Sequence, residues 1–235
     1  MLARMARRAR SVAGGEIYHV MNRGNCRMEL YGKPDDYLAF MRVMEEGRRR
    51  TGMRILAYCL MPNHWHMVLW PRKAADLAAF VGWVSNTHVR RWREHRHKVG
   101  EGHLYQGRFK SFPAQAGKGL YEVLRYVQGN ARRAKLVDRA QDWRYGSLYT
   151  GSHRPEDQVE LTPWPVARPA DWAERVDEPI EAAELNRLRL HLQRERPYGD
   201  AAWTARAVKR MGLEWTMRDR GRPKLNRPKK QKAGR

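Results

Sequence analysis

The first third of the chain carries patterns of apolar and polar residues that are typical of β-strands. Residues 15–21 (GEIYHVM) alternate in polarity, and residues 53–60 (MRILAYCL) form a mainly apolar run. A third strand is predicted within residues 61–71 (MPNHWHMVLWP), where Pro62 and Asn63 separate it from the second strand. We therefore expect the second and third strands to pair as a hairpin.

Apolar residues between and after these strands recur with the period of a helix. Helices are predicted from Pro34 onward, over residues 76 to about 93 and over residues 119 to about 133, and a fourth strand over residues 107–115 (GRFKSFPAQ). The order is βαββαβ followed by a helix, which predicts an α+β, ferredoxin-like fold with an antiparallel sheet. We expect helices to cover one face of this sheet and to leave the other face open.

Changes in composition divide the chain into four predicted regions. These are a basic N-terminal arm (1–14), the ferredoxin-like domain (15–150), an extension (151–215) and a basic, disordered tail (216–235). The extension begins with a segment rich in Pro, Asp and Glu that predicts irregular structure. Amphipathic helices are predicted after it, over residues 181–196 and from Asp200 to Met211.

The charge of the chain predicts a polyanionic partner. The 235 residues carry a formal net charge of +22, from 47 Lys and Arg against 25 Asp and Glu. A nucleic acid is the expected partner, with an affinity that falls as salt rises, and the 9 Trp and 10 Tyr supply faces on which unpaired bases can stack. The alternatives are that the charge serves general solubility, or that the partner is ribosomal or a membrane surface.

Only two cysteines are present, Cys26 and Cys59, which excludes a disulfide framework and a four-thiolate zinc site. No apolar run approaches the roughly 18 residues of a membrane helix. The basic N-terminus lacks the apolar core of a signal peptide, although a transit peptide has a similar composition. We expect a protein of a reducing cytoplasm.

His64 and His66 stand two residues apart in the third predicted strand. Side chains alternate between the faces of a strand, so both imidazoles should leave the open face while Trp65, Met67 and Leu69 face the helices. Two imidazoles on one stiff strand suit a divalent metal that assists attack on a phosphate. The alternative is a pair of core histidines satisfied by hydrogen bonds.

Tyr126 and Asn130 lie four residues apart, on one face of the third predicted helix. A deprotonated phenol held in line can attack phosphorus, and an amide oxygen one turn later can reach the same metal. The alternative is that Tyr126 is an ordinary position of an amphipathic helix, and Tyr121 is its rival as nucleophile.

The remaining histidines stand in less specific contexts. His95 and His97 lie in a charged stretch that predicts a solvated or phosphate-facing patch. His103 is a candidate DNA contact, and His19, in the first strand, is predicted to be structural.

Five segments, taken in order, resemble the REP-associated tyrosine transposases, relatives of the single-tyrosine HUH transposases of bacterial insertion sequences. The segments are GGEIYHVMNRGN, AYCLMPNHWHMVLWP, GHLYQGRFKS, RYVQGNARRAKLV and the late RGRPK. The resemblance covers roughly residues 14–150 and returns in the tail. Its most specific part is the combination of MPNH-x-H with GHLYQGRFKS.

The resemblance implies an HUH nuclease domain that binds magnesium or manganese through His64 and His66. It also implies that Tyr126 is the nucleophile and Asn130 a candidate third metal ligand. The two residues that follow Asn130, Ala and Arg, stand where the family often has Pro and Val.

The same resemblance implies transesterification on single-stranded DNA through a 5′-phosphotyrosine intermediate. The implied partners are REP-like palindromes that fold as hairpins, in the nucleoid of a bacterium. Besides His103, the candidate DNA contacts are Arg108, Lys110, Arg132 and Arg133, each of which has solvated surface charge as its alternative. In the tail, Arg220 and Arg222 form an AT-hook-like RGRP, for which a hairpin clamp and a nonspecific basic tail are the alternatives.

Three classes of function remain open from the sequence. The first is a DNA nuclease and strand transferase that uses Tyr126. The second is a DNA-binding protein on the same fold that does not cleave, and the third is an RNA-binding protein. The DNA target and the choice between monomer and homodimer are open as well.

Overall fold

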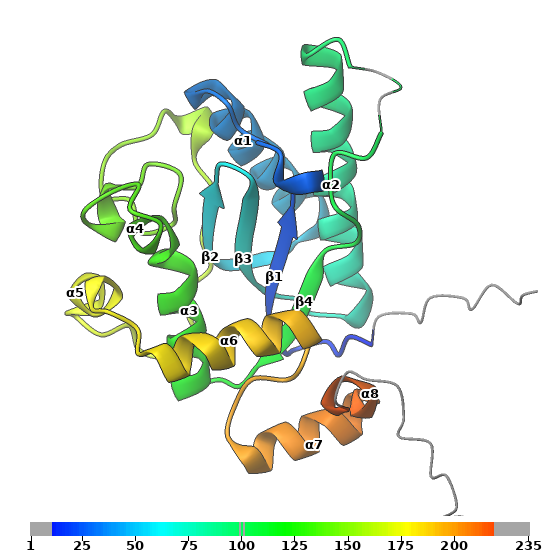
Figure 1. Ribbon diagram of the computed structural model, residues 1–235, viewed down its shortest axis with the longest axis vertical. Helices are drawn as coiled ribbons and strands as arrows, with labels where there is room; N and C mark the ends of the chain where they lie inside the picture. The colour runs from blue at the N-terminus through cyan, green and yellow to red at the C-terminus, as the bar shows by residue number, and fades with distance from the viewer. Residues whose placement is uncertain (1–10, 99, 101, 219–235) are drawn as a thin grey trace, which may run out of the picture.

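The computed structural model describes residues 11–98, 100 and 102–218. Its centre is one antiparallel sheet of four strands in the order β2-β3-β1-β4 (Figure 1). The strands are β1 (Ile17–Arg23), β2 (Arg54–Met61), β3 (His64–Trp70) and β4 (Lys110–Ala114). The predicted hairpin of the second and third strands is confirmed.

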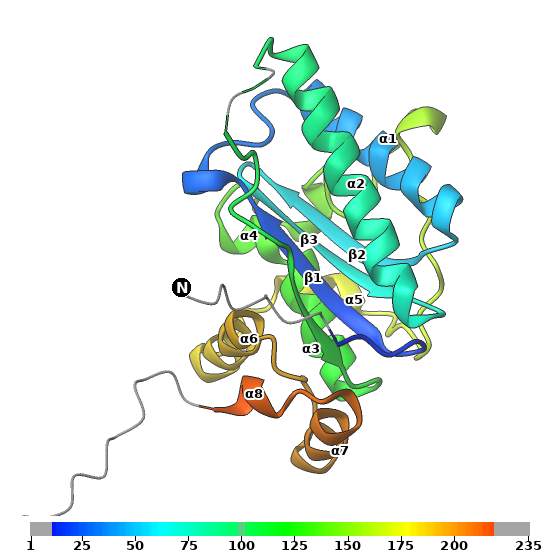
Figure 2. The same cartoon turned by 90° about the vertical axis from the view of Figure 1, so that its right-hand side faces the viewer.

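Two long helices connect the strands and complete the βαββαβ order. They are α1 (Pro34–Thr51), between β1 and β2, and α2 (Ala74–His95), between β3 and β4. The predicted ferredoxin-like fold is therefore confirmed. Figure 2 shows both helices on one side of the sheet. Trp65, Met67 and Leu69 point to this side from β3 and are fully buried, as predicted.

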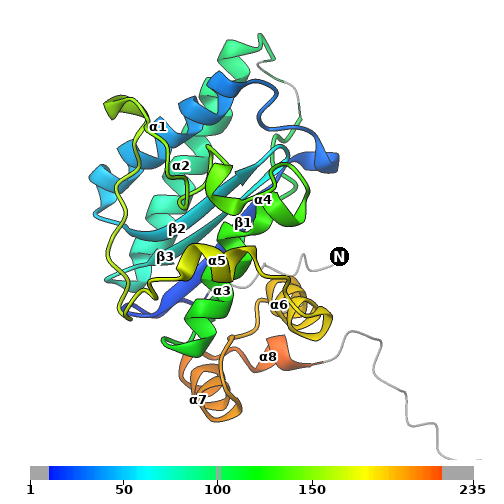
Figure 3. The same ribbon diagram turned by 90° about the vertical axis from the view of Figure 1, so that its left-hand side faces the viewer.

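The second face of the sheet is covered as well, so the expectation of an open face is wrong. The segment α3 (Lys118–Gln128) lies across it, α4 (Asn130–Arg133) follows directly, and α5 (Trp172–Asp177) and α6 (Ala182–Arg194) complete the layer (Figure 3). The physical reason is that α3 and this face of the strands are both apolar, and each removes the other from water. The apolar stripe of α3 consists of Leu120, Val123, Leu124 and Val127, and the strands oppose it with Ile17, Leu56, Val68 and Phe112.

Both edges of the sheet are occupied by later parts of the chain. Along β2, the amide of Leu60 donates to the carbonyl of Tyr145, and the amide of Thr162 donates to that of Ile55. Along β4, the amide of Tyr198 donates to the carbonyl of Pro113 at 2.8 Å. Because exposed edges invite pairing with other chains, this cover protects the sheet from aggregation.

The predicted helices of the extension are present. After α6 come α7 (Ala201–Met211) and α8 (Glu214–Met217). Thr216 is buried in α8, so the boundary predicted at residue 216 falls within a packed helix. The rest of the tail from residue 219 and residues 1–10 of the arm lie outside the described residues.

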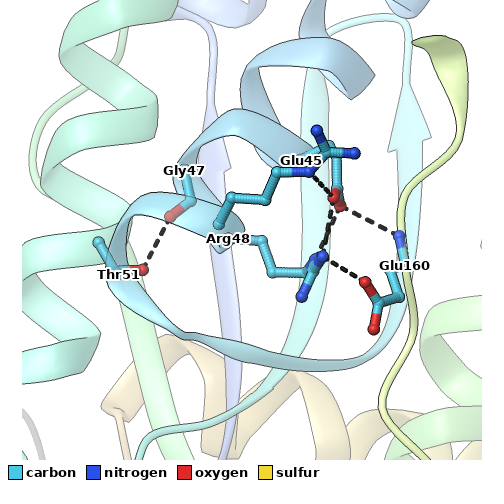
Figure 4. A network of polar contacts seen from close by, with 6 residues as sticks. Glu45, Gly47, Arg48, Thr51 and Glu160 are labelled. Carbon is cyan, nitrogen blue, oxygen red and sulfur yellow. Dashed lines mark hydrogen bonds and ion pairs between the residues drawn. The ribbon is translucent and has the colours of Figure 1, made fainter.

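A buried carboxylate, Glu45 on α1, ties the irregular part of the extension to the domain. It accepts hydrogen bonds from Arg48 at 2.8 Å, from Arg49 at 2.7 Å and from the amide of Glu160 at 3.1 Å (Figure 4). Burial alone would raise the pKa of Glu45, but these hydrogen bonds outweigh burial and lower the pKa to about 2.

We expect the free energy of unfolding to fall as the pH drops from about 5 toward 2, and Glu45→Gln to remove part of this dependence. The pKa of Glu45 in the unfolded chain is about 4.3, above the folded value. The stabilisation is therefore complete above the unfolded pKa and is lost as the pH falls toward the folded one.

At pH 7, Glu45→Gln should lower the free energy of unfolding by about 2 kcal/mol in urea titrations. The neighbouring Glu46 forms an exposed ion pair with Arg91, so Glu46→Gln should change it by about 0.5 kcal/mol or less. Identical pH profiles for the wild type and Glu45→Gln would contradict this account of the network.

Candidate active site

Four rings from distant parts of the sequence meet on the covered face of the sheet, beneath α3. His19 comes from β1, His64 and His66 from β3, and Tyr126 from α3. The ring centroid of His66 lies 5.0 Å from those of His64 and His19 and 5.6 Å from that of Tyr126. The structure thus brings together the predicted imidazole pair and the predicted nucleophile.

His66 is held by a second imidazole. Its Nδ1 lies 2.8 Å from Nε2 of His19, and the two residues are 2% and 0% exposed. Burial, followed by the positive charges around it, lowers the pKa of His66 well below its usual value, and burial lowers the pKa of His19 to about 3. Both rings are therefore neutral at physiological pH. Since Nδ1 of His66 is engaged, its Nε2 is the nitrogen left for a ligand.

His64 is likewise held through its Nδ1, by the preceding residue Asn63. Its Nδ1 lies 2.7 Å from Oδ1 of Asn63, an oxygen that can only accept, so Nδ1 carries the proton and Nε2 the lone pair. Burial and the charge of Arg23 lower the pKa of His64 to about 4. Two neutral imidazoles on one face of a strand, each with Nδ1 occupied, fit a divalent metal held through Nε2. Hydrogen bonding within the core accounts for only one nitrogen of each ring.

A metal at this pair needs ligands of another kind. Among the described residues, no group of three or more His, Cys, Asp or Glu side chains is arranged to hold a metal ion. Amide oxygens, water or phosphate oxygens would complete the coordination. Asn130 is half-buried at the start of α4, four residues after Tyr126, and its role as third ligand stays a prediction.

Tyr126 is 9% exposed and lies against a cation. The guanidinium carbon of Arg133 is 4.6 Å from the centre of the Tyr126 ring, and the same side chain donates to the backbone carbonyl of Tyr126. Burial lowers the pKa of Arg133 to about 10, so it remains charged at neutral pH. The rival Tyr121 instead donates its hydroxyl to the carbonyl of Ala167 at 2.5 Å and packs against Trp172.

Sequence reasoning missed two members of this site, His19 and Arg23. Arg23 lies opposite His64 in the pairing of β1 with β3, and its Nε is buried without a hydrogen-bond partner in the described part of the chain. A signal was available, because residues 17, 19, 21 and 23 share one face of β1. Only the register between the strands shows that this face meets the imidazole pair.

The other predicted DNA contacts are dispersed. Arg132 donates to the carbonyl of Asp138 at 3.0 Å and lies 3.5 Å from a carboxylate oxygen of Asp177, so part of its charge serves the fold. Two of the predicted contacts, His103 and Arg108, line a groove beside α2. The remaining ones are Lys110, at the start of β4, and Arg220 and Arg222, which lie outside the described residues.

Comparisons with known proteins address the family and the fold of the chain. Residues 15–130 match the family model described as transposase IS200 like. A solved structure of a REP-associated tyrosine transposase bound to a REP hairpin is similar to the chain, with 17% identity, a TM-score of 0.51, and 70% of this chain and 98% of that chain covered. At this identity the likeness supports the fold.

A protein of Deinococcus radiodurans R1 assigned to the transposases gives 14% identity, with 56% of this chain and 92% of that chain covered. Its TM-score of 0.35 is too low to indicate a shared fold. No curated protein matches the sequence. No helix in the described part of the chain is long and apolar enough to cross a membrane.

Proposed function

The chain belongs, through residues 15–130, to the IS200-like transposase family, and we propose that this transposase cuts and rejoins single-stranded DNA through a 5′-phosphotyrosine intermediate. The observation that carries the proposal is the contact of Tyr126 with His66, beside His64 and beneath the charge of Arg133. A nucleophile, a pair of metal-binding nitrogens and a fixed cation are the components that transfer of a phosphodiester requires.

In the cleavage step, the phenolic oxygen of Tyr126 attacks the scissile phosphorus. A bond forms between this oxygen and phosphorus, and the bond from phosphorus to the 3′ oxygen breaks. The phenol gives up its proton and the departing 3′ oxygen takes one up, so the products are a 5′-phosphotyrosine and a free 3′-OH. Attack of a 3′-OH on the phosphotyrosine reverses the step and joins strands without a nucleotide cofactor.

The residues around Tyr126 have distinct parts in this step. When magnesium or manganese is bound at His64 and His66, it supplies Lewis-acid polarisation of a phosphate oxygen. Arg23 and Arg133 place positive charge where the phosphate becomes more negative in the transition state. His19 fixes the ring of His66, as hydrogen-bond partners of metal-binding histidines commonly do.

The proposed substrate is a REP-like hairpin with single-stranded flanks, in the cytoplasm of a bacterium. The net charge of +22 supports a polyanionic partner, and the solved transposase of the same fold is bound to a REP hairpin.

The test is to incubate the full-length protein and Mn²⁺ with 3′-end-labelled hairpins taken from palindromes near its gene. A denaturing gel should show a labelled protein–DNA adduct. Tight binding without an adduct on any hairpin would favour a non-cleaving DNA-binding protein. A preference for RNA that does not depend on metal would favour an RNA-binding protein.

We expect His19→Phe to raise the Mn²⁺ concentration needed for half-maximal cleavage by about 10–100-fold, because His66 loses the partner that orients it. His19→Gln retains an amide that can reach Nδ1 and should have a smaller effect. Thermal melting separates this effect from loss of the fold. A folded His19→Phe protein with the wild-type metal requirement would show that His19 is only a packing residue.

A further inference from the structure

A groove of about 660 Å³ is lined by α2 and residues 103–109. Figure 2 shows α2 on the side of the sheet that it covers together with α1. One face of α2 lines the groove, including Gly82, Ser85 and Asn86, and Gln106 and Arg108 line the other wall. Its volume lies within the roughly 300–1,000 Å³ of typical small-molecule sites. His19, His64, His66 and Tyr126 do not line the groove.

The wall opposite α2 is fixed to the sheet. The amide of Asn25 donates to the carbonyl of Leu104 at 2.8 Å, and the amide of Gln106 donates to that of Arg23 at 2.9 Å. Residues 104–106, which precede β4 in the chain, therefore extend the pairing along β1. Gly107, with a φ of 151°, then turns the chain back toward β4, in a conformation that L side chains rarely adopt. The groove is accordingly preformed.

The polar groups of the groove suit an unpaired nucleotide. Its lining contains four carboxamides, a group that can offer a donor and an acceptor to the edge of a base, although Oδ1 of the buried Asn22 already accepts from the amide of Arg23. Oγ of Ser85 is buried and has no hydrogen-bond partner among the described residues. The described part of the lining includes two arginines for phosphate and no carboxylate, and Phe109 supplies an aromatic face. The carboxamides are Asn22, Asn25, Asn86 and Gln106, and the arginines are Arg93 and Arg108.

We propose that this groove binds one unpaired base of the DNA strand that is cleaved, and so sets which phosphate reaches Tyr126. The inference rests on the proposed function. Asn22 and Asn25 line the groove on either side of Arg23, and Arg23 lies opposite His64. A strand seated in the groove can therefore continue past the end of β1 toward the imidazole pair.

A buried hydrogen-bond network connects the groove to β3. Trp65, which lies between His64 and His66, donates through Nε1 to the hydroxyl of Tyr105 at 3.1 Å. This hydroxyl lies 2.7 Å from Nδ1 of His88 on α2, to which it can donate in turn. Tyr105 lines the groove, so the position of a bound base is defined relative to β3.

Gly82→Leu tests the groove without disturbing the core, because a Cβ at Gly82 would meet no atom within 4 Å. Leu is also the better helix former. The measurement is the fluorescence anisotropy of a labelled hairpin with a single-stranded extension, bound to the full-length protein without metal. We expect Gly82→Leu to bind about 10-fold more weakly. Ala79→Leu, which adds the same side chain to an exposed position of α2 outside the groove, should bind as the wild type does.

Single abasic sites along the extension locate the base. With the wild type, one position should lose about 10-fold in affinity, and with Gly82→Leu that position should have no further effect. Binding of folded Gly82→Leu within twofold of the wild type, or equal losses at every position, would overturn the proposal. Equal competition by RNA of the same sequence would overturn the assignment to DNA.

The binding assay separates the two proposals because it needs no cleavage. If binding depends on Gly82 but no adduct ever forms, the groove stands as a base-binding site, while the proposed nuclease and the choice of phosphate fail. If cleavage occurs and Gly82→Leu cleaves and binds normally, the nuclease stands and the groove proposal fails.

Discussion

Tyr126→Phe is expected to abolish the covalent protein–DNA adduct and to slow strand cleavage by at least about 10⁴-fold, as the loss of a covalent nucleophile does in other enzymes. The substitution removes one oxygen and keeps the ring that contacts His66 and Arg133. The fold and the affinity for hairpin DNA should therefore remain those of the wild type. Single-turnover cleavage of 3′-end-labelled hairpins measures the first effect, and fluorescence anisotropy the second.

Tyr121 provides the matched control for this experiment. It lies on the same helix, but its hydroxyl is bound to the carbonyl of Ala167 and its ring packs against Trp172. Tyr121→Phe should lower the free energy of unfolding by about 1 kcal/mol and leave cleavage within about threefold of the wild type. An adduct that persists in Tyr126→Phe and disappears in Tyr121→Phe would show that Tyr121, and not Tyr126, is the nucleophile.

The fold and the shared face of His64 and His66 were predictable because they follow from local patterns. Alternation along β3 places His64 and His66 on one face of the strand, whichever elements pack against the sheet. The position of Tyr126 beside this pair was implied by the resemblance to the transposases, and in the structure the apolar stripe of α3 carries Tyr126 to the sheet. The order of elements fixes the topology, since few arrangements of βαββαβ are compatible with an antiparallel sheet.

The remaining features depend on pairing that no single segment reveals. The stripe of α3 was visible in the sequence, but its destination was not, so the second face was expected to be open. The sequence predicts a structural role for His19, because a lone imidazole in a strand usually has one. Only the register of β1 with β3 places it against His66. The sequence predicts Arg133 as a phosphate contact, and its position over the ring of Tyr126 is visible only in the packed structure.

His64→Ala is expected to slow Mn²⁺-dependent cleavage by about 10³-fold, because polarisation by a metal ion is worth several kcal/mol of transition-state stabilisation. His64 is half-buried at the start of β3, so its truncation should disturb the core less than that of the fully buried His66. Raising the Mn²⁺ concentration should restore part of the activity of His64→Ala, since one imidazole ligand remains. It should restore none of the activity of Tyr126→Phe, which lacks the attacking oxygen.

The second H-x-H of the chain controls for a general effect of losing histidines. His95 and His97 are exposed at the end of α2, and His97 has a φ of 51°, so the two do not share the face of a strand. The double variant His95→Ala, His97→Ala should keep the wild-type metal requirement and cleavage rate. Calorimetric titration with Mn²⁺ should show binding weakened by at least about 10-fold in His64→Ala and unchanged in the double variant. If His64→Ala binds Mn²⁺ and cleaves as the wild type does, the imidazole pair is a hydrogen-bonded part of the core, and the phosphate must be activated by the arginines alone.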